Sequence, residues 1–97
     1  MKLRFSPRAA RDLTEIGDYI RAESPLGARR VRDAILETLA LAANFPLMGR
    51  RQSIDGVRKL VTRRYRYLVY YALDVSRDEL VVLSIRHPRR QGSPVER

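Results

Sequence analysis

Basic side chains, with tyrosines between them, gather in two segments of the second half of the chain. The first segment holds Arg50, Arg51, Arg58, Lys59, Arg63, Arg64 and Arg66, with Tyr65, Tyr67, Tyr70 and Tyr71 among or beside them; the second holds Arg86, His87, Arg89 and Arg90. Guanidinium groups bind phosphate and carboxylate oxygens in pairs, and tyrosine rings stack on exposed bases. If the two segments lie on neighbouring strands, they form one basic surface that contains aromatic rings. The same charges also suit a solvated strand edge, where they prevent pairing with another chain.

Cleavage of RNA by such a surface would need a base for the 2′-hydroxyl proton, an acid for the leaving oxygen and positive charge on the phosphate. His87 is the only histidine, and histidine is the side chain that exchanges protons near neutral pH. Asp55 lies in an expected loop and Glu79 at the far end of its strand, so no carboxylate joins the patch. A histidine before a proline also suits a plain strand end. We therefore favour no catalytic residue; a nuclease would use Arg58, Arg64, Arg66 and His87.

The composition excludes several other classes of site. The chain has 97 residues, no cysteine and one histidine, so we expect no disulfide, no thiol nucleophile, no metal site and no cofactor. It contains no glycine-rich phosphate loop. No apolar run approaches the roughly 20 residues that span a bilayer, and no signal-peptide pattern opens the chain. We expect a soluble cytoplasmic protein that does not bind membranes.

Positive charge is concentrated in the second half of the chain. The net charge is +9; residues 1–48 hold 8 basic and 6 acidic residues, for a net +2, and residues 49–97 hold 12 and 5, for a net +7. Such a field attracts nucleic acid, an acidic protein or an anionic membrane. A genome that favours arginine codons would also raise the charge, but it would not explain the uneven placement.

The periodicity predicts one strand followed by a pair of helices. Residues 2–5 alternate polar and apolar side chains, as a short strand does. Ser6-Pro7 and Ser24-Pro25 are helix start signals, because serine caps free amides and proline suits the first helical position. The first helix is expected to end near Glu23 and the second before Pro46. Apolar positions recur at helical spacing at Ala9, Ala10, Leu13, Ile16, Gly17 and Ile20, and again at Ala28, Val31, Ile35, Leu39 and Ala42, widened by Leu36 and Leu41.

After a loop over residues 46–56 the period changes to two. Strands are expected at 57–61, 65–73 and 80–85, with a hairpin connection at 74–78. The middle strand is apolar on both faces, which indicates a central position, and Tyr70 and Tyr71 on it must point to opposite faces. The prediction is a single domain over residues 1–97, of α+β class and two layers, with the order β-α-α-β-β-β. A helical hairpin packs on a mainly antiparallel four-stranded sheet.

In this order the motifs resemble the RelE/ParE superfamily of bacterial toxins. The resemblance covers nearly the whole chain and rests on Leu-Arg-Phe-Ser-Pro-Arg-Ala-Ala-Arg-Asp-Leu at 3–13, Asn-Phe-Pro-Leu-Met-Gly-Arg at 44–50, Gly-Val-Arg-Lys-Leu at 56–60, Tyr-Leu-Val-Tyr-Tyr at 67–71 and Leu-Ser-Ile-Arg-His-Pro-Arg-Arg at 83–90. It implies a toxin of a type II toxin–antitoxin module, held in a hetero-oligomer by an acidic antitoxin whose C-terminal segment wraps it. RelE-like members cut messenger RNA in the ribosomal A site, whereas ParE-like members act on DNA gyrase.

Two departures from the nuclease pattern favour the ParE-like branch. RelE-like nucleases carry a basic residue where Tyr67 stands, and a tyrosine near the C-terminus that residues 91–97 lack. We therefore expect a gyrase inhibitor; the alternatives are a ribosome-dependent mRNA endonuclease and a non-toxic module that binds nucleic acid. The expected target- or phosphate-binding residues are Arg58, Lys59, Arg63, Arg64, Arg66, Tyr67, Arg86, His87, Arg89 and Arg90. The antitoxin is expected to bind the apolar helix positions Leu13, Ile16, Ile20, Leu36 and Leu39.

Overall fold

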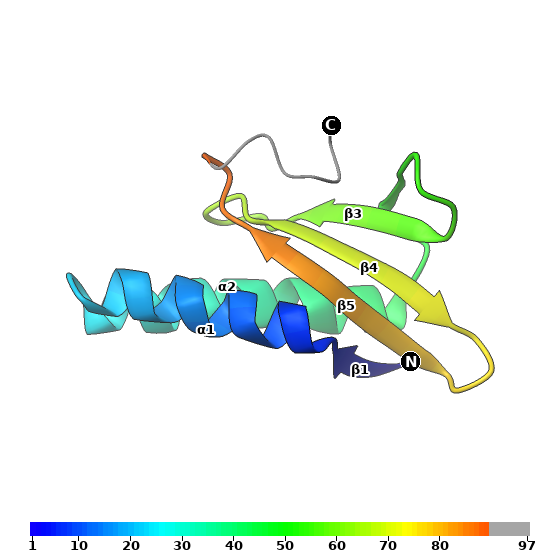
Figure 1. Cartoon of the computed structure of the whole chain (residues 1–97), viewed down its shortest axis with the longest axis horizontal. Coiled ribbons are helices and arrows are strands. Elements are labelled where there is room, and N and C mark those ends of the chain that lie inside the picture. Colours follow the sequence, from blue (N-terminus) through cyan, green and yellow to red (C-terminus); the bar gives the residue numbers. More distant parts are fainter. Residues whose placement is uncertain (90–97) are drawn as a thin grey trace.

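Two helices joined by a tight turn form one layer of the molecule. The computed structural model describes residues 1–89, in which α1 spans Pro7–Arg21 and α2 spans Pro25–Asn44. Each helix begins at a predicted start signal. The serine hydroxyl accepts the backbone N–H three residues further along, at 3.0 Å for Ser6 and 2.9 Å for Ser24. The helices run side by side along one face of the sheet (Figure 1).

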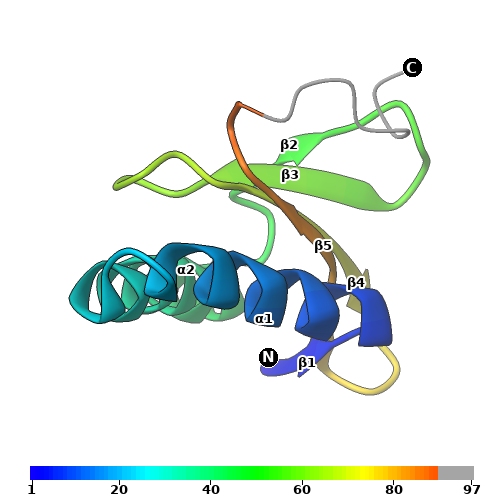
Figure 2. The ribbon, with the colours of Figure 1, turned by 60° about the vertical axis from the view of Figure 1, so that its left-hand side comes forward.

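The second layer is a five-stranded sheet in the order β1-β5-β4-β3-β2. Its strands are β1 (Lys2–Phe5), β2 (Arg50–Arg51), β3 (Val57–Val61), β4 (Leu68–Asp74) and β5 (Glu79–Arg86). β1 pairs with β5 in parallel, and all other neighbours are antiparallel. The predicted α+β class, with a helical pair on a mainly antiparallel sheet, is therefore confirmed, and Figure 2 shows the two layers from the side.

The sheet has one strand more than the four that were predicted. Arg50 and Arg51, inside the expected loop, pair with Lys59 and Arg58 of β3. Two residues are too few to show a period of two, so only their partners on β3 define them as a strand.

The central strand begins later than predicted, at Leu68 instead of residue 65. Val61 pairs with Leu68, so the residues between them must reverse the chain direction. Tyr65 and Arg66 accordingly have φ angles of +68° and +54°, which no extended strand adopts.

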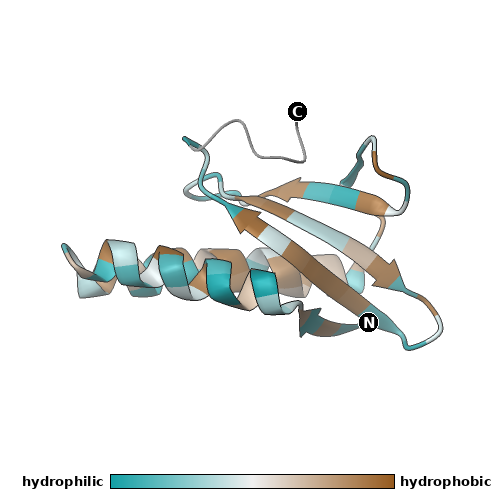
Figure 3. Ribbon diagram, in the orientation of Figure 1, coloured by the Kyte–Doolittle hydropathy of each residue, from teal (hydrophilic) through white to brown (hydrophobic). Residues whose placement is uncertain are grey.

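The core lies between the helices and the sheet. It consists of Ala9, Val31, Ile35, Leu39, Ala42, Leu60, Tyr67, Val69, Tyr71, Leu80, Val82 and Ile85. Tyr71 belongs to this cluster, so its neighbour Tyr70 points to the opposite face; both are buried. Figure 3 shows the hydrophobic residues along β4 and β5 and the hydrophilic outer side of α1.

Candidate functional site

The connection between β3 and β4 presents three arginines and a tyrosine to solvent. We call residues 63–66 the basic loop; all four are exposed. Thr62 holds the base of this loop. Its buried hydroxyl donates to the Arg64 carbonyl oxygen at 2.6 Å and accepts the Tyr67 N–H at 2.9 Å. Because both partners are backbone groups, the hydroxyl fixes the path of the chain through the loop.

Two consecutive residues of the basic loop, Tyr65 and Arg66, adopt left-handed φ angles. For residues with a Cβ this costs roughly 1–2 kcal/mol each. Such strain persists only where the surroundings impose it, and it is common at functional sites. The Arg64 guanidinium lies over the Tyr65 ring, 5.9 Å from its centroid. The loop therefore carries its charges in a defined arrangement.

The exit of β5 brings the second basic segment to the same end of the sheet. Leu68, the first residue of β4, pairs with Arg86, the last residue of β5. The rings of Tyr67 and His87 meet edge to face, with centroids 5.3 Å apart and planes at 85°. Of the first basic segment, the basic loop therefore meets the exit of β5 at one end of the sheet, and the buried Tyr67 links the two instead of offering an exposed ring. Arg90 lies outside the described residues.

The imidazole of His87 makes a hydrogen bond to the following turn. Its Nδ1 accepts the backbone N–H of Arg89 at 3.0 Å, so in the neutral ring the proton is on Nε2. A general base needs an unprotonated nitrogen that faces its substrate. In this tautomer Nδ1 already accepts from Arg89 and Nε2 carries the proton, so the neutral ring presents no nitrogen that could take a proton from a substrate.

A hollow of about 700 Å³ lies between α1 and the exit of β5, and we call it the β5 cleft. It is lined by Asp12, Glu15, Ile16, Tyr19, Tyr67, Ile85, Arg86, His87 and Arg89. The two α1 carboxylates in it were not predicted, although their i, i+3 spacing beside a tyrosine was a usable signal. Asp12 Oδ2 accepts the Ile85 N–H at 2.9 Å. This carboxylate thus continues the pairing of the β5 edge beyond the point where β1 has ended.

Arg58 and Lys59 occupy other places than the basic loop. Arg58 Nη1 donates to the carbonyl oxygens of Gly49 at 2.8 Å and Leu47 at 3.2 Å. The side chain of Arg58 therefore holds the segment that follows α2. Lys59 pairs in register with Tyr70, which places it on the sheet face opposite the helices.

Tyr71 completes the anchor of that segment. Its hydroxyl accepts the Gly49 N–H at 2.9 Å and donates to the Pro46 carbonyl oxygen at 2.8 Å. Burial raises the pKa of Tyr71 above its ordinary value of 10.0, while the Gly49 N–H and the Arg58 charge act in the opposite direction. The hydroxyl is therefore protonated at neutral pH and can serve both partners.

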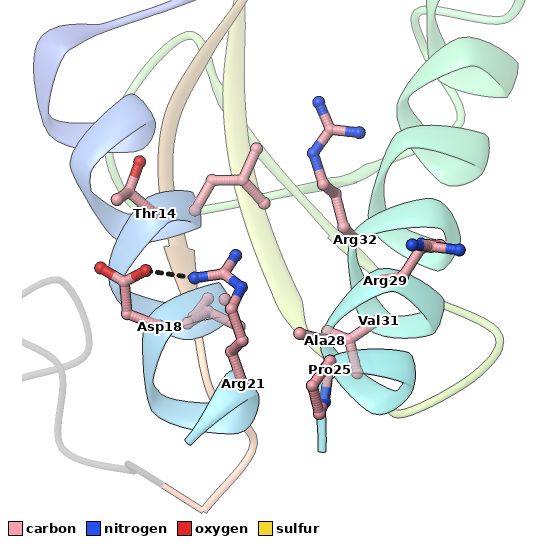
Figure 4. Close-up of a pocket in the computed structure, with 11 residues that line it drawn as sticks. Thr14, Asp18, Arg21, Pro25, Ala28, Arg29, Val31 and Arg32 are labelled. Carbon is pink, nitrogen blue, oxygen red and sulfur yellow. Dashed lines mark hydrogen bonds and ion pairs between the residues drawn. The ribbon is translucent and has the colours of Figure 1, made fainter. Parts of the chain in front are cut away.

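A second hollow, of about 410 Å³, lies between α1 and α2 near the turn that joins them (Figure 4). We call it the helix groove. Its lining is apolar at Leu13, Ile16, Pro25, Ala28 and Val31 and charged at Asp18, Arg21, Arg29 and Arg32. Arg21 pairs with Asp18 at 2.6 Å, whereas Arg29 and Arg32 make no ion pair with any residue from 1 to 89.

The residues predicted to bind the antitoxin divide between this groove and the core. Leu13 and Ile16 line the groove and also pack against the core cluster. Ile20 and Leu36 are partly buried against the core cluster. Leu39 is fully buried, which assigns it to the core and not to a surface for a partner, because its helix face is turned toward the sheet.

Among residues 1–89, no group of three or more metal-ligating side chains comes together. In the same part of the chain, neither helix is both long enough and apolar enough to cross a membrane.

Comparison with known proteins assigns the family. A family model described as the ParE toxin of the type II toxin–antitoxin system, parDE, matches residues 3–92. Y4kP of Sinorhizobium fredii (strain NBRC 101917 / NGR234), which bears a toxin name, is 34% identical over 94 residues, or 97% of this chain and 95% of that protein.

Solved structures agree with this assignment. A chain of the chromosomal ParDE system from P. aeruginosa superposes with a TM-score of 0.75 at 26% identity, over 90% of this chain and 95% of that one. A chain of the intact E. coli RelBE toxin–antitoxin complex shares the fold, with a TM-score of 0.69 at 18% identity, over 92% of this chain and 98% of that one. The chain therefore belongs to the ParE toxin family of type II toxin–antitoxin systems, within the RelE/ParE superfamily.

Proposed function

We propose that this toxin inhibits DNA gyrase. The observation that carries the proposal is the ParE-toxin match over residues 3–92, because the ParE-like members of the superfamily are the ones directed at gyrase. The similarity to a chain of the P. aeruginosa ParDE system supports the same branch.

The basic loop is the surface that we assign to the target. Its three arginines are exposed, and the backbone that carries them is held by Thr62. A pre-arranged loop loses little conformational freedom on binding, so more of its contact energy appears as affinity. The positive charge speeds encounter with a negatively charged surface, as a gyrase–DNA complex presents.

The geometry gives less support to the alternative of an mRNA endonuclease. His87 already uses Nδ1 as an acceptor for a backbone N–H, and Arg58 donates to carbonyl oxygens of the loop after α2. His87 is therefore not arranged as a general base, and Arg58 is not arranged as a cation that binds the phosphate of a substrate. Arg64 and Arg66 remain exposed, and they suit a binding role equally well.

We further propose that an acidic antitoxin binds in the helix groove. The apolar floor can receive a short apolar stretch of a partner, and Arg29 and Arg32 on the rim can pair with acidic residues that flank it. The net charge of +9 favours such a partner. The P. aeruginosa chain that this toxin resembles comes from a toxin–antitoxin system, which supports the same assignment.

A DNA supercoiling assay with purified gyrase tests the target. We expect inhibition at stoichiometric toxin. Replacement of Arg63, Arg64 and Arg66 together by glutamine should weaken inhibition about tenfold, since three exposed charged contacts of about 0.5 kcal/mol each sum to the roughly 1.4 kcal/mol of that factor. The control variant carries Arg11→Gln, Arg30→Gln and Arg77→Gln, which removes the same charge from exposed positions elsewhere. Circular dichroism confirms that both variants are folded.

Absence of inhibition at stoichiometric toxin would contradict the gyrase proposal. An equal loss in the control variant would contradict only the role of the basic loop. Primer extension on translated mRNA examines the alternative: A-site cuts that disappear on His87→Ala would establish a nuclease instead.

Binding of the antitoxin in the helix groove is tested with the protein encoded beside the toxin gene. Gly17→Leu should weaken that complex about tenfold, because Gly17 lines the groove and a leucine would occupy it. Ala10→Leu, at an exposed position of α1 that does not line the groove, is the matched control. Equal affinities of the two variants, measured by titration calorimetry, would place the antitoxin elsewhere.

A further inference from the structure

Arg86 holds a pair of hydrogen-bond donors for which the described part of the chain supplies no acceptor. Its Nε and Nη2 are both buried, and neither makes a hydrogen bond. These two nitrogens share one edge of the guanidinium plane, and their N–H bonds run nearly parallel. That edge is the half of the fork that binds the two oxygens of a carboxylate or phosphate together.

Leaving this edge unpaired is costly to the free toxin. A buried donor that lacks an acceptor destabilises the fold more when it belongs to a charged group than when it belongs to a neutral one. An anion that reaches the edge removes this cost and also gains a bidentate contact. Arg86 lines the β5 cleft, and rotation about its side-chain bonds would turn the buried edge toward an occupant of that cleft.

The other walls of the β5 cleft distinguish between kinds of anion. Asp12 and Glu15 contribute carboxylates from α1 that balance the charges of Arg86 and Arg89, so the cleft attracts a polyanion such as a nucleic-acid backbone less than the basic loop does. Ile16 and Tyr19 add apolar surface that suits an amino-acid side chain. The cleft therefore fits one negative charge on an otherwise weakly polar ligand.

We propose that Arg86 is the receptor for a single carboxylate of an acidic peptide, an aspartate or glutamate side chain seated in the β5 cleft. The identity of this peptide as a segment of the antitoxin rests on the proposed function; the carboxylate site itself does not. The site is separate from the helix groove, since the two hollows share only Ile16. One antitoxin segment that fills both would cover opposite sides of α1.

A titration of the isotopically labelled full chain tests the site without gyrase or antitoxin. The probes are N-acetylglutamate amide, its neutral counterpart N-acetylglutamine amide, and inorganic phosphate at equal ionic strength. We expect a saturable shift of the Arg86 Nε–H resonance with the glutamate compound, none with the glutamine compound, and weaker binding of phosphate. Arg86→Lys keeps the charge but loses the fork, so it should weaken binding of the glutamate compound about tenfold or more.

Arg30→Lys, at an exposed site on α2, is the control and should leave that affinity unchanged. Absence of a saturable shift in the unmodified toxin would overturn the proposal even if the lysine variant failed to fold. Tighter binding of phosphate than of the glutamate compound would overturn it in favour of a nucleic-acid contact. The supercoiling assay on Arg86→Lys is a separate measurement, so failure of the carboxylate site and failure of the gyrase proposal are distinguishable.

Discussion

Gly49→Ala should destabilise the toxin more than any other glycine-to-alanine change in the described chain. A Cβ at Gly49 would lie 2.5 Å from Oη, 2.7 Å from Cε1 and 2.9 Å from Cζ of Tyr71. The Tyr71 ring is fully buried, and its hydroxyl is hydrogen-bonded to the Pro46 carbonyl oxygen, so the ring cannot move away from an added methyl group. The added methyl group must therefore push the segment after α2 away from the sheet.

The magnitude follows from two losses. Overpacking a buried site typically costs about 1–3 kcal/mol. Displacement of the segment also breaks the hydrogen bond from the Gly49 N–H to the Tyr71 hydroxyl, which contributes about 1 kcal/mol. We expect a loss of about 2–4 kcal/mol in the free energy of unfolding, a large part of the roughly 5–15 kcal/mol of a whole domain.

Urea unfolding followed by circular dichroism measures this loss. Gly17→Ala is the matched control: its Cβ would meet only the exposed end of the Arg21 side chain, with Nη2 at 3.3 Å, so helix propensity should stabilise that variant by about 0.5–1 kcal/mol. Combining Gly49→Ala with Tyr71→Phe removes the closest contact but leaves the ring carbons, so the double variant should lose less than the sum of the single ones. A Gly49→Ala protein within about 0.5 kcal/mol of the unmodified toxin, or strict additivity, would refute this account of the contact.

Three further outcomes are expected. Thr62→Val should lower the free energy of unfolding by about 1–3 kcal/mol and speed trypsin cleavage in the basic loop, because a backbone donor and acceptor both lose their partner; unchanged cleavage would contradict this. Asp12→Ala should accelerate amide hydrogen exchange at Ile85 and destabilise by about 1–2 kcal/mol, and an unchanged exchange rate would show that the carboxylate is dispensable there. Because burial raises the folded-state pKa of Tyr71, its contribution to stability is complete below pH 10.0 and falls as the pH rises above that value; Tyr71→Phe should show a smaller loss over that window in urea unfolding.

Much of the fold follows from local chemistry. The serine–proline pairs mark both helix starts because they satisfy free amides within one turn. The α2 stripe from Ala28 to Ala42 is buried as predicted, since helical spacing of apolar side chains leaves one face to cover, but Leu41, which was expected to widen it, is exposed. The same reasoning places β5, whose burial alternates from Glu79 to Ser84, but it does not show the register shift opposite Tyr70 and Tyr71, after which Ile85 faces the core.

The features that sequence patterns did not reveal depend on residues far apart in the chain. Asp12 and Ile85 are 73 positions apart, and no local signal indicates that one accepts from the other. Alternation requires Tyr70 and Tyr71 to face opposite ways, but only the register decides which one meets the helices. Tyr71 takes that side, where Gly49 can donate to its hydroxyl. Likewise, the partners of Arg58 across the loop after α2 are visible only in the folded chain.

In the basic loop, shape and charge have different physical origins. The shape depends on the Thr62 hydroxyl, which is buried and bonds to neutral backbone groups. The ion pair of Arg64 with Glu37 spans 4.0 Å between side chains that are 60% and 73% exposed, so it adds little to the stability of the loop. Salt therefore screens the attraction of the arginines without loosening the loop. Substituting the arginines changes the charge of the basic loop and keeps its shape, whereas substituting Thr62 changes the shape and keeps the charge. Comparing the two sets of variants shows whether the target recognises the positive charge of the loop or its backbone shape.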